Sequence, residues 1–71
     1  MWYVYIIRSV EKEFTYVGYT SDVNRRLEQH NAGLNQSTKA YAPFTVEAYV
    51  ALPSKEKAIE LEKEIFVIAN C

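Results

Sequence analysis

Glu62 is a carboxylate placed among apolar residues. On the last predicted helix of the chain it projects between Ala58 and Ile65, inside the apolar stripe that helical spacing defines. A lone buried carboxylate is costly, and its pKa rises unless a cation keeps it ionised. One interpretation is that Glu62 is a metal ligand, because Mg²⁺ commonly binds through one or two carboxylates and completes its octahedron with waters and substrate phosphate. The alternative is that Glu62 lies at the edge of the stripe, where it reaches solvent or pairs with Arg8 or Arg26.

Arg26 and His30 are four residues apart, so their side chains leave one face of a helix together. An arginine can hold a phosphate through two hydrogen bonds, and a histidine can move a proton near neutral pH. Both properties suit the cleavage of a phosphate ester. The alternative is an arginine that extends to solvent and a histidine that is satisfied inside a half-buried face. Arg25 points about 100° away from Arg26, which predicts a solvated side chain.

Tyrosines are concentrated in the first twenty residues. Tyr3 and Tyr5 share one face of a strand by the period of two, and Tyr16 shares a face with Gly18 on the next strand. Tyrosines in strands usually pack in the core, but a phenol can also act as a general base or phosphate donor when a cation lowers its pKa from about 10. Glycine weakens a strand, so Gly18 indicates either a bulge or a close approach of another group to the backbone.

Three strands and two helices must position these side chains. Aromatic and β-branched residues predict strands at 2–9, 14–20 and 45–52. The first is so continuously apolar that we expect both of its faces to be covered, and the short polar break after it predicts an antiparallel hairpin. The place of the third strand in the sheet stays open.

Capping residues mark the two helices. One begins at residue 23, with Ser21 or Asp22 as its N-cap, and is ended by Asn31 and Gly33. The other covers 55–70, with Ser54 as its N-cap. Residues 34–43 have no clear period and are predicted to be a loop with one helical turn at 38–41. The apolar helix faces are Val23, Leu27 and His30, bordered by Arg26, and Ala58, Leu61, Ile65, Ile68 and Ala69.

The composition predicts one small domain of 71 residues. Hydrophobic residues make up 49% and charged residues 24%, the balance of an ordinary soluble globule, and no apolar run approaches the roughly 20 residues that span a bilayer. The first residues predict a strand and not a secretory signal. A lone cysteine, Cys71, cannot staple the fold, so we expect a reducing, cytoplasmic compartment, and its surroundings do not predict a reactive thiol.

The net charge of −1 lacks the basic footprint of most nucleic-acid-binding proteins. The charge is uneven along the chain, however. Residues 1–40 carry five basic and four acidic side chains, whereas residues 41–71 carry three basic and five acidic ones. A surface that faces phosphate is therefore expected on the N-terminal half.

Four motifs in this order resemble the GIY-YIG nuclease family. YVY at 3–5 stands at the family's first motif, with Tyr3 in place of its glycine, and YVG at 16–18 stands at the second. DVNRRLEQH at 22–30 resembles the following helix, and AIELE, which ends at Glu62, resembles the later helix with the metal-binding glutamate. With HNAG after the first helix and KAY at 39–41, the chain is most similar to small stand-alone bacterial members.

The resemblance implies a two-layer α+β fold with a three-stranded antiparallel sheet flanked by helices, in the order β-β-α-β-α. It also implies hydrolysis of DNA phosphodiester bonds at a single site for Mg²⁺ or Mn²⁺. The implied catalytic residues are Tyr5, Tyr16, Arg26, His30 and Glu62, and the implied substrate-binding residues are Gly18, Arg25 and Lys39.

Each implied catalytic residue has a role that phosphodiester hydrolysis needs. Glu62 would hold the metal, and Arg26 would stabilise the charge that builds on the scissile phosphate. Tyr16 would orient or deprotonate the attacking water, with Tyr5 as its neighbour. His30 would assist proton transfer.

Three functions remain open at this point. A metal-dependent DNA endonuclease, with a role in repair or recombination, explains the glutamate, the arginine, the histidine and both tyrosine motifs together. A catalytically weak or inactive domain that binds nucleic acid would explain the low charge. A structural or protein-interaction domain would use these residues for packing and ion pairing only. Trp2 is expected to pack at its strand start or, if exposed, to serve a homodimer or a protein partner, and no membrane association is expected.

Overall fold

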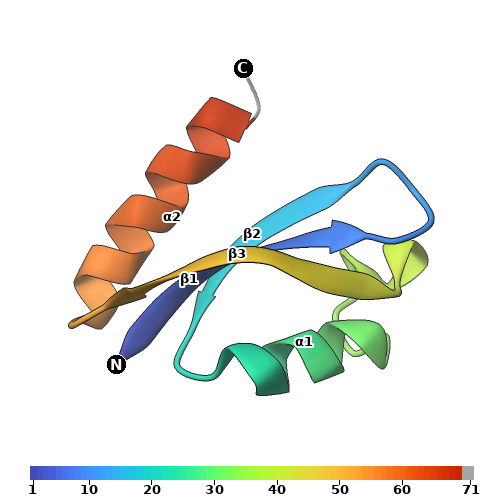
Figure 1. The fold of residues 1–71 in the computed structure, drawn as a ribbon, viewed down its shortest axis with the longest axis horizontal. Coiled ribbons are helices and arrows are strands. Elements are labelled where there is room, and N and C mark those ends of the chain that lie inside the picture. The colour runs from blue at the N-terminus through green and yellow to red at the C-terminus, as the bar shows by residue number, and fades with distance from the viewer. Residues whose placement is uncertain (70–71) are drawn as a thin grey trace.

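The computed structural model describes residues 1–69, with side chains described through residue 65. The elements are β1 (Trp2–Ser9), β2 (Thr15–Thr20), α1 (Val23–Asn31), the 3₁₀ turn η1 (Lys39–Tyr41), β3 (Phe44–Leu52) and α2 (Lys55–Ala69) (Figure 1). The predicted order β-β-α-β-α and the helical turn inside the loop are confirmed. The strands β2 and β3 each differ from the prediction by one residue at their start.

Both predicted N-caps are present. The Asp22 carboxylate accepts a hydrogen bond from the Arg25 backbone nitrogen at 3.1 Å, which begins α1. The Ser54 hydroxyl accepts one from the Lys57 backbone nitrogen at 3.3 Å, which begins α2. Gly33 follows α1 with a φ of 76°, a conformation that glycine adopts without steric cost.

The three strands form an antiparallel sheet in the order β2-β1-β3, so β1 is central. β2 pairs with β1 as the predicted hairpin, and β3 occupies the other edge of β1. Gly18 lies opposite Tyr5 in the β1–β2 register. The β1–β3 register shifts between Ile6 and Ile7, so the irregularity of the sheet lies in that pair and not at Gly18.

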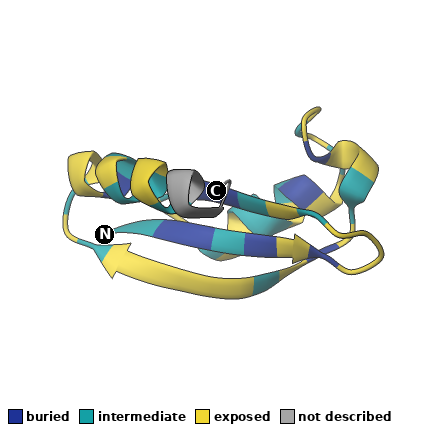
Figure 2. Cartoon of the chain, turned by 90° about the horizontal axis from the view of Figure 1, so that it is seen from above, coloured by how far each residue is buried: buried dark blue, intermediate teal, exposed yellow. Residues whose placement is uncertain are grey.

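The central strand is covered on both faces, as its continuous apolar run predicts. On one face Val4 packs with Ala58 of α2, and on the other Tyr5 and Ile7 lie in a cluster that includes Leu27 of α1. One helix therefore lies on each side of the sheet, whereas the predicted two-layer arrangement would place them together. Figure 2 shows the result, with β1 largely buried and β3 largely exposed.

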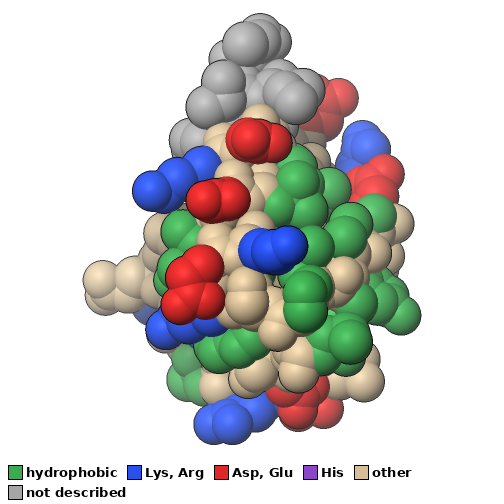
Figure 3. All heavy atoms as spheres, turned by 90° about the vertical axis from the view of Figure 1, so that its left-hand side faces the viewer, with side chains coloured by type: hydrophobic (Ala, Val, Ile, Leu, Met, Phe, Trp, Pro, Cys, Tyr) green, Lys and Arg blue, Asp and Glu red, His purple; other side chains and the backbone are tan. Residues whose placement is uncertain are grey.

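The outer surface of α2 carries charges of both signs. Exposed lysines and glutamates lie side by side over this face (Figure 3). The mixture gives α2 no basic patch for phosphate, in agreement with the acidic balance of residues 41–71.

Some predictions fall outside the described residues. These are the continuation of α2 to Asn70, the thiol of Cys71, and the apolar side chains of Ile68 and Ala69. Within the described part of the chain, α1 and α2 both lack the length and the apolar character needed to cross a membrane.

Candidate active site

Four elements contribute residues to one pocket of about 410 Å³, and half of its lining residues belong to the edge strand β2. Five of the residues singled out in the sequence line it: Tyr5 of β1, Tyr16 and Gly18 of β2, Arg26 of α1 and Glu62 of α2. The other lining residues are Trp2, Val17, Tyr19, Thr20 and Ser21. Residues up to 60 positions apart in the sequence therefore meet in one place, around a space that could hold a phosphate group and water.

Gly18 allows the Tyr5 ring to lie against the β2 backbone. A Cβ at this position would lie 2.6 Å from the Tyr5 hydroxyl oxygen and 2.8 Å from Cζ of Tyr5, closer than real Cβ contacts. The close approach that Gly18 predicts is therefore confirmed, and the approaching group is Tyr5. Gly18 lines the pocket but is itself buried beneath this ring.

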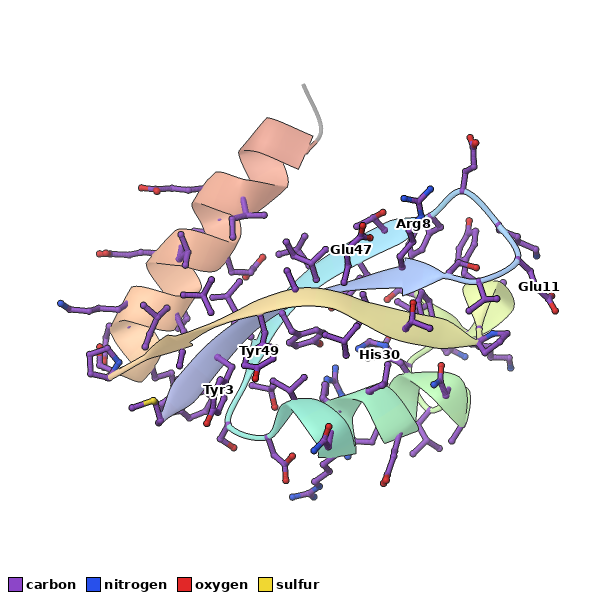
Figure 4. The ribbon with its side chains drawn as sticks, viewed as in Figure 1. Tyr3, Arg8, Glu11, His30, Glu47 and Tyr49 are labelled. Atoms are coloured by element: carbon purple, nitrogen blue, oxygen red, sulfur yellow. The ribbon has the colours of Figure 1, made fainter. Side chains whose placement is uncertain are left out.

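Tyr5 joins the pocket to a buried chain of hydrogen bonds. Its hydroxyl oxygen lies 3.0 Å from Nε2 of His30, and Nδ1 of His30 lies 2.7 Å from the Thr38 hydroxyl. His30 is 0% exposed and points from α1 toward the sheet (Figure 4). It cannot touch a substrate directly, so any proton that it exchanges with the pocket must pass through Tyr5.

Burial keeps the Tyr5 phenol neutral. Desolvation raises the pKa of Tyr5 above its ordinary value of 10.0. The nearby Arg26 guanidinium opposes this rise, whereas the Tyr16 phenol and then the Glu62 carboxylate add to it. Arg26 and Glu62 line the same pocket as Tyr5.

The pKa of His30 is lowered below its ordinary value of 6.5, first by burial and then by the charge of Arg26. The unfolded chain therefore binds a proton at a pH where folded His30 does not. We expect His30 to leave the free energy of unfolding unchanged above pH 6.5. Below pH 6.5, the free energy of unfolding should fall by up to about 1.4 kcal/mol per pH unit. Urea unfolding between pH 7.5 and 5.5 measures this loss.

His30→Gln is the matched variant for this pH dependence. His30→Gln should lower the free energy of unfolding at every pH, because it disrupts the buried hydrogen bonds to Tyr5 and Thr38. It should also make that free energy depend less on pH between 7.5 and 5.5. An equally steep profile in His30→Gln would assign the pH dependence to other groups.

Arg26 is half-buried and held in place by its own helix. Its Nη1 donates a hydrogen bond to the Gln29 side-chain oxygen at 2.9 Å. The spacing of three residues places the two side chains on one helix face, so this contact could have been predicted from the sequence. Gln29 fixes the guanidinium of Arg26 at the rim of the pocket.

Glu62 is half-buried and lines the pocket with Arg26. Glu62 therefore lies at the pocket and not beside Arg8, which is exposed and does not line the pocket. Among the described residues, no three side chains of His, Cys, Asp or Glu gather as a ready-made metal cage. One carboxylate beside an open pocket still fits Mg²⁺, which keeps several waters and takes substrate phosphate as a ligand.

The structure does not bring every predicted site residue into the pocket. Arg25 is exposed on α1 and Lys39 is exposed on η1, and neither lines the pocket. Their predicted substrate contacts would have to lie beyond it. A second pocket of about 420 Å³, lined by Tyr3 and Tyr49 among others, contains none of the predicted catalytic residues.

Trp2 packs within the fold. It lies against the cluster around Val4, its ring centroid is 6.2 Å from that of Tyr19, and Lys55 Nζ lies 5.3 Å from the ring centre. These contacts agree with the packing alternative for Trp2.

A family model described as the GIY-YIG catalytic domain matches residues 1–67. The chain belongs to the GIY-YIG family, which is a family of nucleases. Its pocket is formed by the same motifs that carried the resemblance.

Several small bacterial proteins are similar to this chain. It is 41% identical over 64 residues to UPF0213 protein BH0048 of Halalkalibacterium halodurans, covering 89% of this chain and 67% of the relative. It is 39% identical over 62 residues to UPF0213 protein Reut_B5558 of Cupriavidus pinatubonensis, covering 86% and 68%. The chain thus spans about two thirds of the length of these relatives, whose names state no activity.

The fold matches a solved structure. The solution NMR structure of UPF0213 protein BH0048 from Bacillus halodurans has a TM-score of 0.53 and 40% sequence identity, covering 92% of this chain and 70% of that one. The predicted α+β fold with a three-stranded antiparallel sheet is confirmed.

Proposed function

We propose that this protein is a metal-dependent endonuclease that hydrolyses DNA phosphodiester bonds. One observation carries the proposal: a carboxylate, a guanidinium and two phenols, from α2, α1, β2 and β1, line one pocket. These groups match the needs of the reaction, which are an activated water, a neutralised phosphate and a stabilised leaving oxygen. Family membership supports the same reaction. We propose that the enzyme acts in DNA repair or recombination.

The protein's own groups would divide the work as follows. Arg26 donates hydrogen bonds to the non-bridging phosphate oxygens as negative charge builds on them. Tyr16 is half-buried at the pocket, and its hydroxyl oxygen accepts a hydrogen bond from the attacking water. A phosphorus–oxygen bond forms to that water while the bond to the leaving sugar oxygen breaks. The attacking water releases one proton to solvent in the open pocket, and the sugar oxygen takes up one proton from that solvent, so the protons balance. Tyr5 stays neutral and anchors the pocket to His30.

Glu62 is the residue that would hold Mg²⁺ or Mn²⁺. A divalent ion supplies Lewis-acid stabilisation of the phosphate and lowers the pKa of a bound water. The carboxylate and the neighbouring hydroxyl groups are oxygen donors, which these ions prefer.

The test is the nicking of supercoiled plasmid DNA by the full chain. We expect nicked circles in Mg²⁺ or Mn²⁺ and none in excess EDTA. DNA affinity should fall with salt, with a log–log slope of about −0.9 for each phosphate contacted. Gel electrophoresis and retention on DNA measure the two effects.

The other outcomes identify the alternatives. DNA retention without nicking in either metal would reject the endonuclease and favour a binding module, which the net charge of −1 would make a weak one. Neither nicking nor retention at about 50 mM salt, where phosphate contacts are strong, would reject both functions.

A further inference from the structure

Thr38 is a polar residue that lies outside the pocket and is 0% exposed. A buried hydroxyl is costly unless it forms hydrogen bonds, and valine would fill the same volume without that cost. The Thr38 hydroxyl lies 2.7 Å from Nδ1 of His30 and 3.5 Å from the Asn35 carbonyl oxygen, to which it can donate. The hydroxyl therefore has one short contact, and that contact is with the histidine behind Tyr5.

The hydrogen-bond partners of Thr38 and His30 set the direction of the buried hydrogen bonds. The Thr38 hydroxyl can donate its proton to the Asn35 carbonyl oxygen, so toward His30 it acts as the acceptor of the Nδ1 proton. The phenol proton of Tyr5 is then directed to Nε2 of His30, which lies 3.0 Å away and must act as the acceptor. A neutral imidazole that accepts at Nε2 carries its proton on Nδ1, and that proton points at the Thr38 oxygen.

We propose that Thr38 is a positioning residue that fixes His30 in the Nδ1-protonated form, so that the Nε2 lone pair holds the Tyr5 hydroxyl. The alternative tautomer would donate from Nε2 to the Tyr5 oxygen, and its Nδ1 would need the Thr38 proton that otherwise goes to the Asn35 carbonyl oxygen. The proposal deepens the proposed nuclease function and rests on it for the effect on catalysis.

The loop that carries Thr38 is anchored at both ends. The Asn31 side chain accepts a hydrogen bond from the Phe44 backbone nitrogen at 2.6 Å and donates one to the Phe44 carbonyl at 3.2 Å. The Ser9 hydroxyl donates to the Tyr41 carbonyl at 2.6 Å. These contacts tie the loop to the sheet, so Thr38 is presented to His30 from a fixed backbone.

The chain contains a single histidine, so its imidazole nitrogens can be observed without ambiguity by ¹⁵N NMR. In the wild type at pH 7.5 we expect a protonated Nδ1 and an unprotonated Nε2. Thr38→Ser keeps the hydroxyl and should keep this signature. Thr38→Val removes the hydroxyl and should give a mixture of tautomers or protonation at Nε2. A wild type protonated at Nε2, or a Thr38→Val spectrum equal to that of the wild type, would overturn the proposal.

Nicking kinetics provide the second measurement. We expect Thr38→Val to lower kcat about tenfold, the effect of one net hydrogen bond, with KM changed less than about twofold. Thr38→Ser should retain activity within about twofold. A serine variant as slow as the valine variant would overturn the proposal, because it would indicate that the lost methyl group and not the hydroxyl matters. If the wild type does not nick DNA, the proposed function fails, and the NMR spectra of the wild type and of Thr38→Ser still decide the role of Thr38.

Discussion

Glu62→Gln is expected to slow plasmid nicking by about a thousandfold, because it removes the one carboxylate of the pocket. A metal ion contributes several kcal/mol of charge stabilisation in such reactions, and each 1.36 kcal/mol is a factor of ten in rate. Glutamine keeps the volume of the side chain, so this half-buried position should stay filled and the fold should persist. Nicking rates at saturating Mg²⁺, with a circular dichroism melt of each variant, measure the two effects.

Glu64→Gln is the matched control. It removes the same charge from the same helix, but Glu64 is exposed and does not line the pocket. We expect its rate to stay within about twofold of the wild type, since exposed charges interact weakly. DNA affinity in Glu62→Gln should be unchanged or higher, because a negative charge near phosphate is lost. Equal rates for both variants and the wild type would exclude Glu62 as the metal ligand.

The helices and strands could be predicted because their signals are local. Asp22 and Ser54 cap the two helices where the sequence predicts, and the continuous apolar run of β1 identifies a strand with two buried faces. The position of β3 depends instead on pairing across more than thirty residues, which no local pattern encodes. Its place beside β1 therefore came only from the structure.

Most of the candidate site could be predicted because each motif lies on a regular element with a defined face. Tyr16 and Gly18 share one face of β2 through strand periodicity, and Glu62 is found by its place in the apolar stripe of α2. A charge among apolar residues is a strong signal, since burial makes it costly unless it is used.

The surroundings of these residues were harder to predict. The complete burial of His30 depends on the loop that closes over it, and Thr38 lies in that loop with no periodic signal of its own. Arg25 and Lys39 illustrate the opposite case, because a basic residue next to a motif does not have to line the pocket. Side chains on irregular backbone are placed by tertiary contacts that the sequence does not display.

Arg26→Ala is expected to lower kcat about 100- to 1,000-fold, the usual effect of removing a group that stabilises charge in the transition state. Arg26→Lys keeps the positive charge but loses the planar fork that matches phosphate oxygens, so we expect an intermediate rate. Single-turnover nicking separates this loss from weaker DNA binding. A full rate in Arg26→Lys would mean that charge alone is required and that the contact with phosphate is not bidentate.

Arg25→Ala separates a local role of Arg26 from a general effect of positive charge. It removes the same charge from the exposed side of the same helix, and we expect only a small rise in KM that disappears at high salt. The single histidine reports the difference without an assay of activity: the charge of Arg26 lowers the pKa of His30, so Arg26→Ala should raise that pKa, whereas Arg25→Ala should not. If both variants changed the pKa of His30 equally, the Arg26 guanidinium would not lie closer to His30 than Arg25 does. The assignment of Arg26 to the scissile phosphate would then fail as well.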